Sequence, residues 1–281
     1  MSDKPLISVI IPVYNCEKTI AAALDSILRQ TYDNLEVIVV DDASTDGTKK
    51  AVEAIAAQDS RAKLLSADND PERFDAALNR NVNAGWSARN TGLREARGAY
   101  ITFQDADDAS FLNRIELQYS LLKKHGSTHL TIDWIQFDQD LVGKKAGLLE
   151  NPEVIGPDAL YAMSQRSKGF VAKISTRLNR IIPFHWKRKR IVNKLFFGSL
   201  ENYPAAGNSP LFERTVIEKV VFRKLRDRVW PSFMGRGADK DFNFHVAETF
   251  RNSHVVLSPL YMWRVKDQNP RYLGGIKEII M

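Results

Sequence analysis

The sequence of 281 residues contains a single cysteine, Cys16. A disulfide framework and a zinc site built from cysteines are therefore excluded, and nothing requires an oxidising compartment. No apolar run approaches the roughly 20 residues that a membrane-spanning helix needs. Residues 1–4 lead into an apolar run without the features of a signal peptide. We expect a cytoplasmic protein, with any membrane contact peripheral, at the inner face of the cell membrane.

The first predicted loop lacks glycine. Residues 6–11 form a nearly continuous apolar run, which predicts a strand covered on both faces, and Pro12 is expected to end it. Residues 12–15, Pro-Val-Tyr-Asn, have neither the glycine-rich turn of a dinucleotide-binding unit nor the Gly-Lys-Ser/Thr of a P-loop. Both kinds of site are excluded. A sugar-phosphate nucleotidyltransferase is also disfavoured, because a glycine-rich basic first loop is expected there.

Acidic residues are absent from one long stretch. Residues 165–194 contain ten Lys and Arg and no Asp or Glu, so the net charge of +6 is concentrated there. Apolar and basic side chains fall on opposite sides of a predicted helix within residues 165–197. Such a helix suits an anionic membrane surface, and we expect this contact from Arg166 to Lys194. The alternative is a basic helix that is solvated or that binds the acceptor. The segment's chemistry also suits nucleic acid, but no nucleic-acid partner is expected.

Strands and helices alternate along the first half of the chain. The patterns predict strands at residues 6–11, 35–40, 63–66 and 100–103, and helices at 17–29, 48–58, 86–96 and 113–124. This alternation indicates an α/β protein with a parallel, doubly wound sheet, whose ligands bind at the carboxyl ends of the strands. Further along, residues 128–138 predict a strand with alternating faces, and residues 215–220 predict a helix.

Three carboxylates, those of Asp105, Asp107 and Asp108, follow the strand at residues 100–103. Like charges this close repel unless a hard divalent cation lies between them. Mg²⁺ and Mn²⁺ usually keep open positions for phosphate oxygens, so the pattern indicates a metal and diphosphate site. A solvated acidic turn is the alternative. The metal site is favoured because other strands end in groups that face the same crevice, namely Pro12, Asp41 and Asp42.

A second acidic pair, Asp239 and Asp241, follows a glycine-containing loop at the start of a predicted helix. Side chains two positions apart on a helix point about 200° apart, so only one of them can face the crevice. Phe242 and Val246 mark the buried stripe, which places Asp239 on the inward side and turns Asp241 away. The alternative is that both acids only complement the helix dipole.

Four motifs carry a resemblance to a known family. They are Ser-Val-Ile-Ile-Pro-Val-Tyr-Asn at residues 8–15, Val-Asp-Asp-Ala-Ser-Thr-Asp-Gly-Thr at 40–48, Ala-Arg-Asn-Thr-Gly-Leu at 88–93 and Asp-Ala-Asp-Asp at 105–108. In this order they resemble family 2 glycosyltransferases of the GT-A fold. The resemblance implies a single mostly parallel sheet. Residues 1–125 would form its nucleotide-sugar-binding part, and residues 126–281 its acceptor-binding and catalytic-base part, with a variable helical region.

The resemblance also implies site residues. Those expected to bind the donor are Pro12, Tyr14, Asn15, Asp41, Asp42, Arg89 and Asp105. Asp105 and Asp107 would hold Mn²⁺ or Mg²⁺ on the donor diphosphate. The family's Glu-Asp pair, whose aspartate is the catalytic base, corresponds to Ala238-Asp239. Asp239 is therefore the expected base although the glutamate is missing, with Asp241 in reserve.

These residues predict a metal-dependent inverting glycosyltransferase. It would move a sugar from a nucleotide diphosphate sugar, with a UDP-sugar expected, to a hydroxyl of a glycan or lipid-linked acceptor, as in bacterial surface polysaccharide synthesis. A metal would stabilise the departing diphosphate while the base removes the acceptor proton. The alternative, favoured by the missing glutamate, is a non-catalytic module of the same fold that binds a nucleotide sugar or a membrane.

Overall fold

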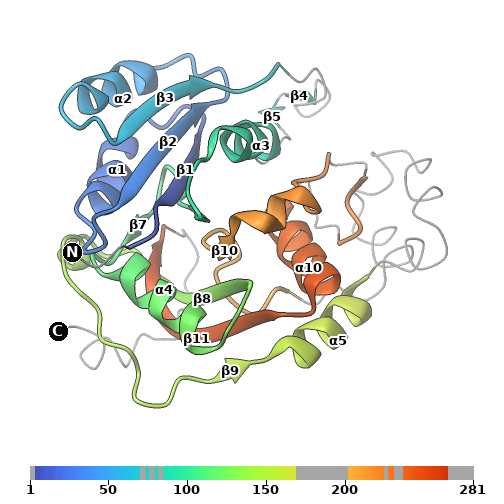
Figure 1. The fold of residues 1–281 in the computed structure, drawn as a ribbon. Helices are drawn as coiled ribbons and strands as arrows, with labels where there is room; N and C mark the ends of the chain where they lie inside the picture. The colour runs from blue at the N-terminus through green and yellow to red at the C-terminus, as the bar shows by residue number, and fades with distance from the viewer. Residues whose placement is uncertain are drawn as a thin grey trace.

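A computed structural model describes residues 4–69, 74–75, 80–81, 85–168, 202–224, 227–230 and 237–264, with backbone alone at 74–75 and 80–81. Within these residues one sheet of nine strands forms the centre of the molecule, and helices cover both of its faces (Figure 1). The strand order is β3-β2-β1-β6-β10-β8-β11-β7, with β9 beside β11. Strands β4 (Phe74–Asp75) and β5 (Arg80–Asn81) pair separately.

The first half of the sheet is parallel, as predicted. It consists of β1 (Ile7–Val13), β2 (Leu35–Asp41), β3 (Ala62–Ser66) and β6 (Tyr100–Phe103). Its helices are α1 (Ile20–Leu28), α2 (Thr48–Ala56) and α3 (Trp86–Glu95). Val9 and Ile11 pack in the core of the α1 side, whereas Ile10 packs in the core of the α3 side. Burial on both faces explains why these strands are continuous apolar runs.

Pro12 does not end β1, contrary to the expectation. The strand continues to Val13, with Pro12 opposite Val40 of β2. On its other side β1 pairs with β6 only as far as Ile10, whose carbonyl accepts a hydrogen bond from the amide of Gln104. Peptide groups alternate sides along a strand, so the nitrogen of Pro12 faces the space beyond the end of β6, where no ladder bond is lost.

The second half of the sheet is mixed. Strand β10 (Leu211–Glu213) lies antiparallel between β6 and β8 (His129–Gln136), and β8 is parallel to β11 (Ser253–Trp263). The short strands β7 (Ala109–Ser110) and β9 (Val154–Ile155) are antiparallel to β11. The helices here are α4 (Arg114–Lys124), α5 (Pro157–Ser167) and α10 (Ala238–Phe250). The sequence did not predict β9, β10, β11 or α5.

Two expectations for this half are corrected. The helix expected at residues 215–220 is a short 3₁₀ helix, η3 (Arg214–Glu218); a second one, η2, spans Gln139–Leu141. Strand β8 is buried on both faces rather than on one, because Leu130 and Ile132 enter the core beneath α4 while His129 bonds to Asn243 of α10. Its polar residues His129 and Thr131 bond to Asn243 and Tyr203 inside the protein and do not mark a solvent face.

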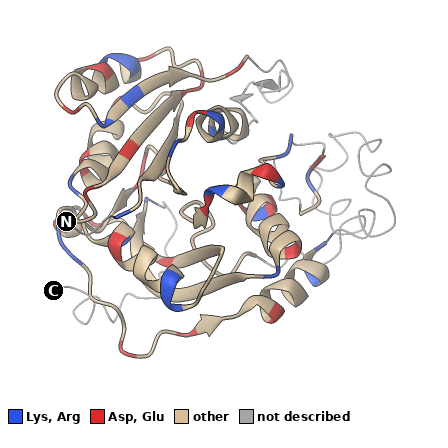
Figure 2. Cartoon of the chain, viewed as in Figure 1, with Lys and Arg blue, Asp and Glu red and all other residues tan. Residues whose placement is uncertain are grey.

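The predicted basic segment lies mostly outside the described residues, which include its start, Arg166 to Lys168, but none of residues 169–200. Lys168 forms an ion pair with Glu248 of α10. Elsewhere, Lys and Arg occur together with Asp and Glu on helices on both sides of the sheet (Figure 2). Among the described helices none has the length and apolar character needed to cross a bilayer.

Candidate active site

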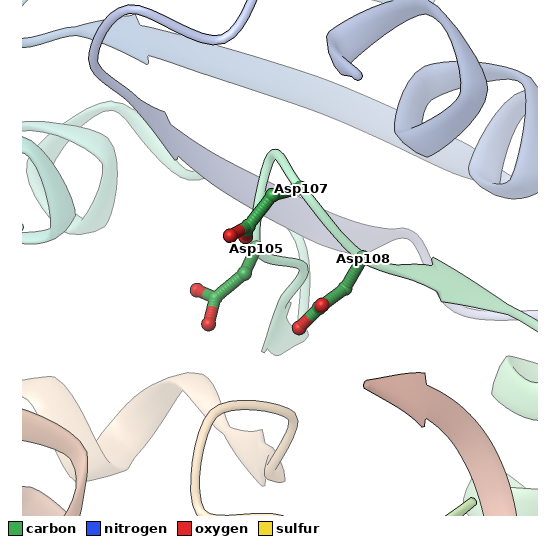
Figure 3. A group of neighbouring side chains, drawn as sticks. All are labelled: Asp105, Asp107 and Asp108. Atoms are coloured by element: carbon green, nitrogen blue, oxygen red, sulfur yellow. The ribbon is translucent and has the colours of Figure 1, made fainter. Parts of the chain in front are cut away.

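Asp105, Asp107 and Asp108 leave one turn at the carboxyl end of β6 and project to the same side (Figure 3). Each offers one carboxylate oxygen, and these oxygens lie within 4.8 Å of one another. The amide of Asp108 donates to the carbonyl of Asp105 at 3.2 Å, which closes the turn. Asp107 is exposed, Asp105 is partly exposed and Asp108 is buried. The predicted cluster is thus brought together, with Asp108 as a third member.

The carboxylate of Asp105 is held from two sides. Arg89 donates from Nη2 to Oδ1 at 2.7 Å, and Asn208 donates from Nδ2 to Oδ2 at 2.8 Å. Burial raises the pKa of Asp105, and the positive charge of Arg89 opposes this shift. Arg89 reaches the turn because α3 lies close on β1 at Gly92, where a Cβ atom would come within 2.4 Å of Ile10.

Asp108 is held by the last strand. The hydroxyl of Tyr261 donates to its Oδ2 at 2.8 Å, and the amide of Arg264 donates to its Oδ1 at 2.7 Å. The Tyr261 hydroxyl also accepts from Asn208 at 3.1 Å and from the amide of Asp105 at 3.2 Å. Burial, followed by the charges of Asp105 and Asp107, raises the pKa of Asp108 to about 8. The turn is therefore fixed by β11 as well as by α3.

This donor set fits a hard divalent cation. All three groups are carboxylates, which are preferred ligands of Mg²⁺ and Mn²⁺, and their oxygens converge on one small volume. Their mutual repulsion contributes to the raised pKa values of Asp105 and Asp108, and a cation between them would relieve it. Asp105 and Asp107 remain the predicted ligands, and Asp108 lies within reach of the same volume.

A cavity of about 550 Å³ opens on one side of the acidic turn. It is lined by Pro12, Val13, Tyr14, Cys16, Asp42, Gly85, Ala88, Arg89, Asp105, Ala106 and Asp107. Five of the residues predicted to bind a donor are in this set. Gly85, in the left-handed region at φ 69°, lets the chain turn into α3 directly beside Arg89.

Two other predicted donor residues, Asn15 and Asp41, lie beside this cavity without lining it. Asp41 is buried and accepts from the amide of Ser44 at 3.1 Å and from Lys49 at 3.4 Å. Asn15 accepts from the amide of Thr45 at 2.8 Å. The contact of Asn15 holds the second loop against the first, whereas those of Asp41 lie within the second loop and the start of α2. The role of both residues toward a donor stays a prediction.

A second cavity, of about 700 Å³, lies on the other side of the turn. Its lining includes Asp105, Asn208 and Asp239. Asp239, in the first turn of α10, approaches Gly207 so closely that a Cβ there would come within 3.2 Å of its Oδ2. Asp239 thus faces the crevice, as the helix geometry predicts.

Asp241 points elsewhere. Its carboxylate is buried and accepts from the amides of Val229 at 2.7 Å and Trp230 at 3.0 Å, and from Nε of Arg223 at 3.0 Å. The expectation that it turns away from the crevice is met, but it turns into the protein rather than toward solvent. Its contacts identify it as an anchor for the segment before α10.

Three side chains at the site were not predicted as site residues. Asn208 precedes β10 and bonds to the acids, and Tyr261 of β11 binds Asp108. The Nδ2 of Asn243 in α10 donates to the carbonyl of Gly207 at 2.7 Å, and its Oδ1 accepts from Nε2 of His129 at 2.8 Å. Only the Gly-Asn-Ser-Pro turn at residues 207–210 carried a local signal, and that signal indicates a loop rather than a contact.

The family model of Glycosyl transferase family 2 matches residues 8–196. A similar relative is UDP-Glc:alpha-D-GlcNAc-diphosphoundecaprenol beta-1,3-glucosyltransferase WfgD of Escherichia coli, 37% identical over 143 residues, which are 50% of this chain and 51% of the relative. Another is glycosyltransferase GlyG of Streptococcus pneumoniae, 34% identical over 134 residues, or 48% and 40% of the two chains. The matches thus span about half of the curated relatives or less.

Solved structures show the same fold at low identity. TarS 1–349 of S. aureus in complex with UDP-GlcNAc superposes with a TM-score of 0.54 at 18% identity, covering 94% of this chain and 60% of that one. The mannosyltransferase PcManGT of Pyrobaculum calidifontis, in complex with GDP-Man and Mn²⁺, gives a TM-score of 0.54 at 20% identity, with coverages of 96% and 59%. These likenesses support the predicted α/β fold.

Proposed function

Because the chain belongs to glycosyl transferase family 2, we propose that it transfers a sugar from a nucleotide diphosphate sugar to an acceptor hydroxyl, with inversion at the anomeric carbon. One observation carries the proposal: Asp105 lines both cavities. A donor whose nucleotide lies in the cavity of Pro12 and Tyr14 would have its diphosphate at the acidic turn. Its sugar would then point toward Asp239, where we place the acceptor.

We propose a UDP-sugar as the donor and a lipid-linked glycan as the acceptor, in the synthesis of a bacterial surface polysaccharide. The name of WfgD supports this choice, since it gives UDP-Glc and a diphosphoundecaprenol-linked acceptor for that protein. The complex of TarS with UDP-GlcNAc supports it as well. The proposed cation is Mn²⁺ or Mg²⁺, which agrees with the Mn²⁺ complex of PcManGT and with the three converging carboxylates here.

In the proposed reaction the acceptor oxygen forms a bond to the anomeric carbon as the bond from that carbon to the diphosphate oxygen breaks. Asp239 takes the acceptor proton. Arg89, already beside Asp105, faces the departing diphosphate and offsets part of its charge. A bound divalent cation would add Lewis-acid stabilisation of that leaving group. Asp105 and Asp107 would hold the cation.

The test is a screen of nucleotide sugars for thermal stabilisation and hydrolysis, each with and without Mn²⁺. A ligand at about 100 times its dissociation constant stabilises the folded state by about 2.7 kcal/mol, which a thermal shift detects. We expect one donor to stabilise the protein and to be hydrolysed slowly in the presence of Mn²⁺. If no nucleotide sugar does either, the proposal is wrong.

A second candidate is a non-catalytic module that only binds nucleotide sugar. It is favoured by Ala238, which occupies the position where the family's motif has a glutamate. This candidate predicts metal-dependent donor binding with no hydrolysis and no transfer.

The membrane contact predicted from Arg166 to Lys194 stays a prediction. Binding to anionic but not to neutral liposomes, reversed by salt, would support it.

A further inference from the structure

Two tryptophans line the cavity that contains Asp239. Trp134 of β8 and Trp263 of β11 meet edge to face, with ring centroids 4.8 Å apart and planes at 85°. Trp263 is 41% exposed, whereas most large apolar side chains among the described residues are buried. A half-exposed indole ring inside a cavity that also presents polar groups offers a flat binding surface.

The strand geometry places this ring next to the acids. Trp263 is two residues beyond Tyr261, so the two side chains leave the same face of β11, about 7 Å apart along the strand. The hydroxyl of Tyr261 contacts Asp108. Trp134 is opposite Tyr261 in the pairing of β8 with β11, and its ring supports that of Trp263 from the side. The platform is thus built on two paired strands rather than on a loop.

The polar lining distinguishes a sugar from a lipid. Besides the two indoles the cavity presents polar side chains that are not buried, namely Asp105, Asn202, Asn208 and Asp239. A prenyl or alkyl chain lying there would remove these groups from water without offering hydrogen bonds, which is costly. A pyranose ring has one face of C–H groups that packs on an aromatic ring, and a rim of hydroxyls that can bond to carboxylates and side-chain amides.

We infer that Trp263, supported by Trp134, is the platform on which a pyranose ring of the acceptor stacks, with its reacting hydroxyl toward Asp239. The inference rests on the proposed function and adds the chemical class of the group that occupies this cavity. In the proposed function the nucleotide of the donor lies in the other cavity and only its sugar enters beside Asp105, which leaves the part of this cavity at Trp263 to the acceptor. Any lipid attached to the acceptor then lies outside the cavity.

The probe is a panel of methyl α- and β-pyranosides, whose binding is measured by saturation-transfer NMR on the full chain. The wild type should bind a subset of the panel. Trp263→Ala should bind the same sugars about tenfold to hundredfold more weakly, because the stacked area is lost. Trp263→Phe keeps an aromatic face and should stay within a few-fold of the wild type. Leu148→Ala is the control, since Leu148 is equally exposed, at 40%, but lies outside the cavity lining.

Thermal midpoints of the variants show whether each is folded. If Trp263→Ala is not folded, Trp263→Phe still allows a comparison with the wild type. The inference is overturned if no pyranoside binds the wild type, if folded Trp263→Ala binds as well as the wild type, or if only vesicles containing undecaprenyl phosphate bind. Hydrolysis of donor by the wild type is measured separately. If hydrolysis is absent while Trp263-dependent sugar binding is present, the proposed function fails and the sugar subsite stands.

Discussion

The two sides of the acidic turn are built differently. On the side proposed for the donor, much of the lining comes from short loops that directly follow parallel strands, such as Tyr14, Asp42 and Asp105. On the acceptor side, each contact joins distant parts of the chain: Tyr261 reaches Asp108 from 153 positions away and Asn208 reaches Asp105 from 103. One side is therefore encoded locally, and the other depends on how the sheet is assembled.

The largest expected effect tests the donor side alone. Asp107→Asn should reduce transfer to background and abolish Mn²⁺-dependent donor binding, because one anionic ligand of the cation site is lost. The fold should persist, since Asp107 is exposed and its loss reduces repulsion within the turn. Calorimetric titration of donor with and without Mn²⁺ measures this. Unchanged metal dependence in the variant would show that the cation site is elsewhere.

The next prediction concerns the acceptor side. Asp239→Asn should lower turnover by ~10²–10⁴-fold, the usual contribution of a positioned base, while donor and metal still bind. Turnover is measured at saturating donor. Asp107→Asn would then lose donor binding, whereas Asp239→Asn would lose only the chemical step. The two variants therefore distinguish the two sides of the acidic turn.

Asp241→Asn is the matched control. Its carboxylate accepts two backbone bonds and one from Arg223. The substitution should therefore destabilise the fold by about 2–4 kcal/mol, seen in denaturant unfolding, with turnover per folded molecule largely kept. A collapse of turnover in Asp241→Asn together with near-normal activity in Asp239→Asn would assign the base to Asp241.

A smaller effect is expected where the halves meet. Asn208→Ala removes the donor that links Asp105 to Tyr261 and should lower transfer about tenfold, because the acids lose their orientation. Raising the Mn²⁺ concentration should recover part of the loss. Asn252→Ala is the control: its side chain bonds to Gly126 and Thr128 at the other end of β8 and β11. Equal losses in both variants would mean that Asn208 acts only through stability.

The last prediction concerns stability and belongs to the half of the sheet that contains β8. Burial lowers the pKa of His129 from 6.5 to about 4, which the bond to Asn243 opposes. Between these pH values the unfolded chain binds more protons at this residue than the folded one, so the free energy of unfolding should fall as pH falls from 6.5 to 4. His129→Gln should make this dependence shallower in denaturant titrations. An unchanged slope would show that other groups cause the dependence.

The sequence predicted the donor half well. Its apolar runs, amphipathic helices and acids at strand ends are local patterns, and parallel topology then brings the strand ends to one edge. Even there it misplaced the end of β1, because the tolerance for Pro12 depends on where β6 stops. Family membership was predicted correctly from motifs that lie almost entirely in this half.

The acceptor half was predicted only in part. The orientation of Asp239 toward the cavity was predicted because helix periodicity fixes which side of α10 it occupies, and its role as the base stays a prediction. Asn208, Tyr261 and Trp263 carry no such signal, since their positions follow from the insertion of β10 and the pairing of β11 with β8. A three-residue strand such as β10 is too short for its alternation to be recognised.

That short strand also has a consequence for how the protein is made. β10 lies between β6 and β8 and pairs with both, yet its residues, Leu211–Glu213, follow those of β8 by about 75 positions. During synthesis β6 and β8 emerge long before the strand that joins them, and both carry bare hydrogen-bonding edges until it arrives. We therefore expect nascent chains that end before Leu211 to associate with one another or to depend on chaperones. The docking of β10, rather than the formation of the parallel half, should limit the rate of refolding.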